Sequence, residues 1–124
     1  MILFCDTSAL IKLYIKEEFS AEVQAQAVAA KGIVVSRIAW AEAMAALARR
    51  VRENPRDADA IEAVRTRLRI DWTGFAIVEV TQSLVEQAGD YADTFALRGY
   101  DSVQLASARQ IQEAASEELR FACF

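Results

Sequence analysis

Two aspartates stand at positions where a carboxylate can bind a ligand. Asp6 directly follows the short apolar run 2–5, and Asp101 stands at the start of a helical pattern. An acid that follows a buried strand lies at the carboxyl edge of the sheet, where α/β proteins bind ligands. Aspartate is also a good helix N-cap, although Thr7 and Ser8 can supply that cap in place of Asp6. Position alone therefore leaves capping and ligand binding open for both aspartates.

Asp101 shares one face of its predicted helix with largely apolar residues. These residues are Leu105, Ala108, Gln112 and Ala115. We expect this face to point inward, and a carboxylate at its top then requires a cation or hydrogen bonds, because burying an unpaired charge is costly. The alternative is a first-turn aspartate that only caps the helix or interacts with its dipole.

Glu42 is a third candidate, but the helical pattern around it argues for the surface. The large residues of its helix, Trp40, Met44, Leu47 and Val51, form one stripe, and Glu42 lies roughly opposite. Its neighbours Ala41, Ala45 and Ala46 are small, however, and would let another element approach closely. Glu42 is therefore either a surface glutamate or an acid in a cleft.

The chain contains no histidine, and its two cysteines are Cys5 and Cys123. The lack of histidine excludes Ser–His–Asp and Cys–His nucleophilic catalysis, histidine general bases and histidine-ligated zinc sites. Both cysteines stand in apolar stretches, so we expect buried, reduced thiols of a cytoplasmic protein rather than a disulfide. A set of carboxylate ligands without histidine or thiolate suits Mg²⁺ or Mn²⁺, and such sites commonly serve phosphoryl-transfer chemistry.

The composition is that of a single folded domain. The 124 residues are 54% hydrophobic and 26% charged, with four glycines and one proline, which excludes a disordered or collagen-like chain. No apolar run approaches the roughly 18–20 residues of a membrane span. The N-terminus has no basic segment and reaches Asp6 at once, which is unlike a signal peptide. We therefore expect no association with membranes.

The charge of the chain is unevenly distributed. There are 14 basic and 18 acidic residues, a net charge of −4, which is unlike a general nucleic-acid coat protein. Residues 49–69 nevertheless hold seven arginines against four acids: Arg49, Arg50, Arg52, Arg56, Arg65, Arg67 and Arg69. This basic segment suits local contacts with phosphates, and the alternative is a solvated helical surface with i,i+4 ion pairs.

Short apolar runs alternate with longer helical patterns along the chain. We expect strands at 2–5, 33–35, 75–80 and 119–124, and helices at 9–16, 21–30, 38–53, 57–70, 81–97 and 101–116. Ser20 and Thr81 are predicted to cap helices, and Gly32, Asn54 and Gly99 to end or interrupt them. This order predicts an α/β fold: a single three-layer domain with a short parallel sheet of about four strands flanked by helices. Functional residues are then expected just after residues 5, 36, 80 and 124.

Three segments together resemble the PIN-domain ribonucleases, and specifically the VapC-like toxins of type II toxin–antitoxin systems. They are 4–14, 36–43 and 97–106, which read FCDTSALIKLY, SRIAWAEA and LRGYDSVQLA. The resemblance spans nearly the whole chain in the order and spacing of that family. It implies a PIN-like fold over residues 1–124 and a Mg²⁺- or Mn²⁺-dependent endoribonuclease, a hydrolase whose catalytic and metal-binding acids are Asp6, Glu42 and Asp101.

The same resemblance implies partners and a reaction. A toxin of this kind forms a homodimer and is neutralised by a small cognate antitoxin, whose C-terminal segment covers or enters the acidic cleft. Asp6 and Asp101 would hold the metal ion, with Glu42 binding it directly or through water. Water would attack an RNA phosphodiester to leave a 5′-phosphate and a 3′-hydroxyl, and we expect Arg49, Arg50 and Arg52 to hold the RNA backbone.

One feature departs from the family. Its members usually carry a further acid just after the last strand, where this chain ends at Phe124. We therefore expect the C-terminal end of the domain to be missing, and the α-carboxylate of Phe124 is not counted as a ligand. This departure keeps a second function open, a non-catalytic PIN-like module that acts through protein contacts.

Two other classes that use an acid after a strand fit the sequence less well. A haloacid-dehalogenase-type phosphatase needs a second aspartate two residues after the first, where Ser8 stands. A receiver domain needs an acid pair in its first loop and a phospho-acceptor aspartate after a central strand, but the loop after Val80 begins with Thr81. The sequence lacks the residues that the chemistry of either class requires.

Overall fold

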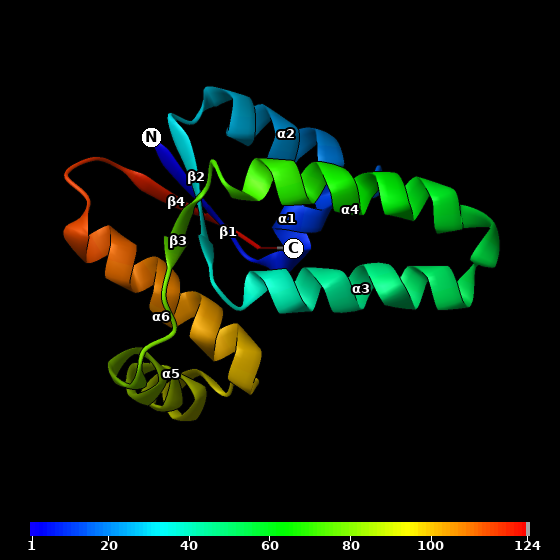
Figure 1. Cartoon of the computed structure of the whole chain (residues 1–124). Helices are drawn as coiled ribbons and strands as arrows, with labels where there is room; N and C mark the ends of the chain where they lie inside the picture. Colours follow the sequence, from blue (N-terminus) through cyan, green and yellow to red (C-terminus); the bar gives the residue numbers. More distant parts are fainter. Residues whose placement is uncertain (124) are drawn as a thin grey trace.

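Four parallel strands form one sheet between two layers of helices in the computed structural model, which describes residues 1–123 (Figure 1). The strands are β1 (Ile2–Cys5), β2 (Gly32–Ser36), β3 (Ala76–Val78) and β4 (Leu119–Ala122), in the order β3-β2-β1-β4. The helices are α1 (Thr7–Lys12), α2 (Ser20–Ala29), α3 (Ala39–Glu53), α4 (Ala58–Trp72), α5 (Gln82–Phe95) and α6 (Gly99–Ala114). The predicted α/β class, three layers and parallel sheet of about four strands are thus confirmed.

Each face of the sheet builds its own hydrophobic core, because successive side chains of a strand point to opposite faces. Leu3 and Cys5 of β1 belong to a cluster with α1 to α4. Phe4, which lies between them in the chain, belongs to a cluster with α5 and α6. Figure 1 shows these two groups of helices on opposite sides of the sheet. The apolar run 2–5 therefore supplies both cores, as expected of a central strand in a parallel sheet.

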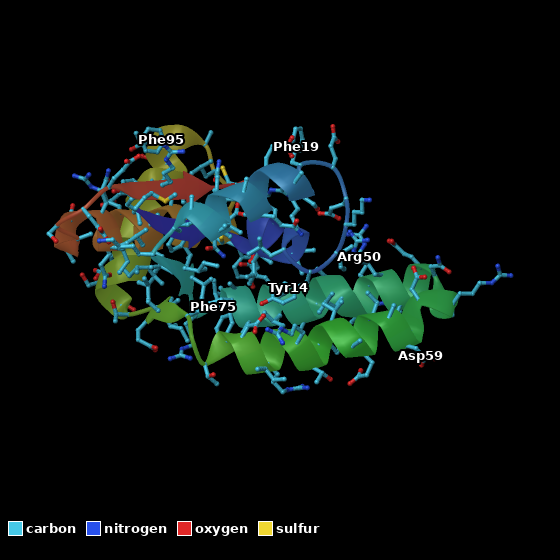
Figure 2. The ribbon with its side chains drawn as sticks, turned by 90° about the horizontal axis from the view of Figure 1, so that it is seen from above. Tyr14, Phe19, Arg50, Asp59, Phe75 and Phe95 are labelled. Atoms are coloured by element: carbon cyan, nitrogen blue, oxygen red, sulfur yellow. The ribbon has the colours of Figure 1, made fainter. Side chains whose placement is uncertain are left out.

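Helices α3 and α4 form a hairpin that extends beyond the sheet (Figures 1 and 2). Leu47 of α3 and Leu68 of α4 are fully buried in the core between the hairpin and the sheet. The predicted break at Asn54 is confirmed, since α3 ends at Glu53 and a short 3₁₀ helix, Pro55–Asp57, leads into α4. One side of α3, from Glu42 in its first turn to Arg50 in its last turn, reaches the candidate site.

The first helix differs from its prediction. α1 spans Thr7–Lys12, so it starts before residue 9, and the predicted helical residues 13–16 form a turn and a loop. Asp6 itself caps α1, because its Oδ1 accepts a hydrogen bond from the Ala9 N–H at 2.9 Å. The capping alternative left open for Asp6 is therefore confirmed, and Thr7 and Ser8 do not replace it as the cap. The early start places Thr7 on the helix, where its side chain is available for another contact.

Other element boundaries were predicted with mixed success. Thr81 caps α5 as predicted, accepting the Leu84 N–H at 3.2 Å. Ser20 is the first residue of α2 rather than its cap, and its hydroxyl accepts the Glu17 N–H at 2.9 Å. Gly32 begins β2 instead of ending α2, and Gly99 begins α6 instead of separating two helices.

The third and fourth strands are shorter than predicted, and they end at Val78 and Ala122. Phe124, at which the last strand was predicted to end, lies outside the described residues. No helix in residues 1–123 has the length and apolar character that crossing a membrane requires.

Candidate active site

A pocket with a volume of about 540 Å³ opens where β1 and β4 end. β1 has β2 on one side and β4 on the other, so chain connections run in opposite directions from this point, the usual ligand site of a parallel sheet. Three predicted acids line the pocket, as do eight other residues: Asp6, Glu42 and Asp101, with Thr7, Ser8, Ile11, Glu17, Ala46, Arg50, Gln104 and Cys123. The acids come from the start of α1, the first turn of α3 and the first turn of α6.

The carboxyl end of β2 contributes to the site as predicted, through Glu42 in the first turn of the helix that follows it, but among the described residues the end of β3 does not. Among the described residues, none that immediately follows residue 36 or residue 80 lines this pocket. Arg37, which follows β2, instead forms an exposed ion pair with Glu79 after β3. The pocket is therefore lined by residues that follow β1, β2 and β4, and by residues of α6.

Asp6 is half-buried, and one of its oxygens is used by the protein itself. Oδ1 accepts the Ala9 N–H at 2.9 Å and the Ser8 hydroxyl at 2.7 Å. Burial raises the pKa of Asp6 more than any other influence. The hydrogen bonds from Ala9 and Ser8 act in the opposite direction, the charge of Asp101 raises the pKa further, and the charge of Lys12 lowers it. The rise comes mainly from burial, which the hydrogen bonds and the charge of Lys12 do not fully offset.

Glu42 is held in the pocket by two neutral donors. Its Oε1 accepts the Thr7 hydroxyl at 2.8 Å and the Gln104 Nε2 amide at 2.7 Å. The same amide also contacts Thr7 Oγ1 at 3.2 Å. The helical stripe had favoured a surface position for Glu42, and that interpretation was wrong. The small alanines gave the correct indication, since Ala46, one turn after Glu42, lines the same pocket.

Asp101 lies at the open rim of the pocket. Its side chain is 59% exposed, and its Oδ2 lies 3.7 Å from Nε of Arg98, which is itself 95% exposed. The predicted inward face was right for Ala108, which is buried, but wrong for Asp101 and Gln112, which are exposed, and Leu105 is only half-buried. The buried face of α6 is instead formed by Ser102, Val103, Gln104, Ala106, Ser107 and Ala108. Asp101 reaches the pocket from the edge of this face.

Besides the three acids, the pocket is lined by Glu17 and Arg50, which belong to an ion-paired cluster. Glu17, on the loop between α1 and α2, pairs with Lys12 at 2.9 Å and with Arg50 of α3. Figure 2 shows Arg50 on α3 where this loop passes the helix. Partial burial of Glu17 opposes its ionisation, but the hydrogen bonds and charges of Lys12 and Arg50 outweigh that effect and lower its pKa. Glu17 and Arg50 form part of the pocket wall, and Lys12 is buried.

The two cysteines lie in different surroundings. Cys5 is buried and Cys123 is exposed, and both are free thiols. The prediction of buried thiols without a disulfide was thus right for Cys5, but the predicted burial was wrong for Cys123. Loss of solvent around Cys123, together with the charges of Asp6 and Asp101, raises the pKa of its thiol. Cys123 is therefore protonated near neutral pH and is a poor metal ligand there.

The pocket offers oxygen ligands suited to a hard divalent cation. In residues 1–123, no three carboxylate or thiol side chains are close enough together to form a complete metal cluster by themselves. Mg²⁺, however, commonly takes one or two protein carboxylates and completes its shell with water and substrate phosphates. Asp6 Oδ2 and Glu42 Oε2 make no hydrogen bond to a described residue, in contrast to the second oxygen of each carboxylate. These residues therefore fit a partly hydrated Mg²⁺ or Mn²⁺.

Comparison with known families decides the identity of the fold. A family model described as "PIN domain" matches residues 3–120. The chain belongs to the PIN-domain family. This PIN domain is also 34% identical over 111 residues to Ribonuclease VapC45 of Mycobacterium tuberculosis (strain CDC 1551 / Oshkosh), a match that covers 86% of this chain and 74% of the relative. The predicted resemblance to VapC-like PIN domains is confirmed.

Solved structures show the same fold. A toxin–antitoxin complex from Klebsiella pneumoniae matches with a TM-score of 0.69 and 21% identity, covering 98% of this PIN domain and 83% of the matched chain. VapC20 of Mycobacterium tuberculosis, described as a Sarcin-Ricin loop cleaving toxin, matches with a TM-score of 0.66 and 22% identity, covering 89% and 83%. At these identities the structural likeness supports the fold alone.

Sequence reasoning missed three residues of the pocket of this PIN domain. Thr7 was interpreted only as a possible cap, and Gln104 and Glu17 were not considered. Gln104 had a detectable signal, because it lies one helical turn after Asp101 and so projects from nearly the same side of α6. Glu17 had none, since a glutamate in a loop acquires its role only when the fold brings Lys12 and Arg50 to it.

Proposed function

We propose that this PIN domain is a metal-dependent endoribonuclease that acts as the toxin of a toxin–antitoxin pair. The observation that carries the proposal is the convergence of Asp6, Glu42 and Asp101 on one pocket from three separate helices. Membership of the PIN-domain family and 34% identity to a VapC ribonuclease support the same activity.

The three acids would hold the cation and the reacting water. A bound Mg²⁺ or Mn²⁺ would generate a nucleophilic water and neutralise charge on the RNA phosphate. Asp6 and Glu42 would each contribute the oxygen that is not bonded to the protein, and Asp101 would bind from the rim. Hydrolysis would leave a 5′-phosphate and a 3′-hydroxyl.

Arginines on α3 would hold the RNA backbone beside the acids. Arg50 lines the acidic pocket, and Arg49, Arg50 and Arg52 line a second hollow along the same helix. Guanidinium groups recognise phosphate oxygens through paired N–H donors. Of the three, Arg50 is the best placed to contact a phosphate near the cleaved bond, because it lines the same pocket as the acids, whereas Arg49 and Arg52 line only the second hollow.

A small antitoxin protein would neutralise the nuclease, which would act in the cytoplasm as a homodimer. The toxin–antitoxin complex among the structural neighbours supports a protein partner. The acidic pocket would be covered by a segment of that antitoxin, and an excess of negative charge in the pocket favours a basic residue in the covering segment.

RNA cleavage by the purified chain tests the proposed activity. Total cellular RNA is incubated with the protein in Mg²⁺, Mn²⁺ or EDTA, and products are mapped by end labelling. We expect cuts at defined sites in the presence of metal, and Asp6→Asn or Asp101→Asn should slow them by about a hundredfold or more, since loss of metal-ion catalysis removes several kcal/mol of transition-state stabilisation.

Asp59→Asn provides the matched control. Asp59 is also an exposed aspartate in the first turn of a helix, but it lies near the far tip of the α3–α4 hairpin (Figure 2). Its substitution should leave cleavage unchanged. Equal cleavage in EDTA, or by the Asp6→Asn protein, would exclude the metal-dependent mechanism, and a complete lack of cleavage would favour a protein-binding module.

A further inference from the structure

Three hydrogen bonds connect the helices that supply the three acids. Thr7, directly after Asp6 on α1, donates to Glu42 of α3 at 2.8 Å. Gln104, one turn after Asp101 on α6, donates to Glu42 at 2.7 Å and to Thr7 at 3.2 Å. The triangle of Thr7, Glu42 and Gln104 therefore spans all three elements at the floor of the pocket.

The orientation of the Gln104 amide leaves its oxygen without a hydrogen-bond partner among the described residues. Gln104 is 4% exposed, and its Oε1 is buried with no hydrogen-bond partner among the described residues. Rotation of the amide by 180° would place this oxygen against Glu42 Oε1 and prevent the donation seen here, because a carboxylate only accepts hydrogen bonds. The ionised carboxylate thus dictates which way the amide points, although a buried carbonyl without a partner is unfavourable.

The triangle also determines which oxygen of Glu42 is left for a ligand. Thr7 and Gln104 both donate to Oε1, so the carboxylate is fixed against rotation by two donors from two different helices. Oε2 then has no bond to a described residue. Residues that hold a metal-binding side chain in place commonly change metal affinity by about 10- to 100-fold when they are replaced.

We propose that Gln104 is a positioning residue, whose amide locks Glu42 against Thr7 and presents Glu42 Oε2 to the divalent cation. The role rests on the nuclease function proposed above. Gln104 acts through Glu42 and does not itself bind metal or RNA. Its buried location below the acids matches this role, since the amide contacts the side of Glu42 that is already used by the protein.

The test uses substitutions that keep size and remove donors. Gln104→Met retains the length of the side chain, and Thr7→Val is isosteric, whereas Thr7→Ser keeps the hydroxyl. Gln110→Met is the matched control, because Gln110 is an exposed glutamine on the same helix. Mn²⁺ binding is measured by calorimetric titration without RNA, and cleavage is measured across a range of Mn²⁺ concentrations.

We expect Gln104→Met and Thr7→Val each to raise the Mn²⁺ dissociation constant by about tenfold. Cleavage by both variants should recover toward the wild-type rate at high Mn²⁺ concentration, which a general defect of folding would not produce. Thr7→Ser and Gln110→Met should retain wild-type affinity. Should Gln104→Met fail to fold, Thr7→Val still tests the same triangle.

The possible failures can be told apart. If the wild type binds Mn²⁺ and cleaves RNA but Gln104→Met and Thr7→Val bind Mn²⁺ equally well, the positioning role is overturned and the nuclease function stands. If the wild type neither binds Mn²⁺ nor cleaves RNA, both proposals are overturned.

A thermal-unfolding cycle in EDTA tests the contact itself without metal. We expect Glu42→Met and Gln104→Met to change the Tm non-additively when combined, because residues in direct contact are energetically coupled. Additive changes would show that the two side chains are independent and would overturn the positioning role.

Discussion

The carboxylates at the two ends of the acidic pocket have different kinds of hydrogen-bond partner. At one end, Asp6 and Glu42 receive hydrogen bonds from neutral groups: a backbone N–H, two hydroxyls and an amide. At the other end, Glu17 is paired with two cations, Lys12 and Arg50. Neutral donors orient a carboxylate without neutralising its negative charge. Two cations beside one carboxylate instead give a net positive charge.

The opposite pKa shifts at the two ends have this same origin. Burial raises the pKa of Asp6 despite its hydrogen bonds, while Lys12 and Arg50 lower the pKa of Glu17 despite its partial burial. The pocket therefore has an uncompensated negative end, where a divalent cation is favourable, and an end with excess positive charge. This difference matches the metal and phosphate positions proposed above.

The largest expected difference between the two ends is in metal binding. Mn²⁺ at about a hundred times its dissociation constant should stabilise the wild type by about 2.7 kcal/mol and raise its Tm by roughly 10 °C. Asp6→Asn should abolish this rise, whereas Glu17→Gln should keep it. Asparagine is a good N-cap, so Asp6→Asn should preserve the start of α1. Differential scanning fluorimetry measures the Mn²⁺-induced rise in Tm of both variants. Loss of this rise in Glu17→Gln alone would mean that the metal binds at the Glu17 end rather than at the Asp6 end.

RNA affinity should depend on the ion-paired end of the pocket, where Arg50 lies. In a background of Asp6→Asn, which prevents cleavage, Arg50→Met should weaken RNA binding by about tenfold and reduce the dependence of log Kd on log salt by about one unit. Arg49→Met, on the same helix, should have a smaller effect because Arg49 is mostly exposed and does not line the acidic pocket. Filter binding at several salt concentrations gives both quantities. Equal effects of the two substitutions would argue against a specific phosphate site at Arg50.

The fold could be predicted because local signals agreed with each other. The apolar run 2–5 and the β-branched residues 33–35 indicated buried strands, and Thr81 and Asn54 marked helix boundaries that the structure confirms. Asp6 could be placed for the same reason, since an acid directly after a central strand has only one edge of the sheet on which to lie.

The rest of the site depends on contacts between distant elements. Glu42 is turned into the pocket by Thr7 and Gln104, which are 35 and 62 residues away in sequence, and no periodicity within α3 encodes these bonds. The inward position predicted for Asp101 failed because Asp101 lies at the edge of the buried face of α6, where its side chain is 59% exposed at the rim of the pocket. Helical periodicity indicates which side of a helix is apolar, but the exposure of a residue at a helix end depends on what packs there.

The smallest expected effect is the pH dependence of stability at the ion-paired end. The folded-state pKa of Glu17 is lowered, so its pairing stabilises the protein above the unfolded-state pKa and is lost as pH falls through the folded value. At pH 7, Glu17→Gln should reduce stability by about 1–2 kcal/mol, because Lys12 is buried and its pairing is weakened. The difference in Tm from the wild type should disappear in acid, below the ordinary carboxyl range. Glu18→Gln, a neighbouring exposed position, should show little difference at any pH, and a pH-independent effect of Glu17→Gln would mean that packing rather than charge holds this end together.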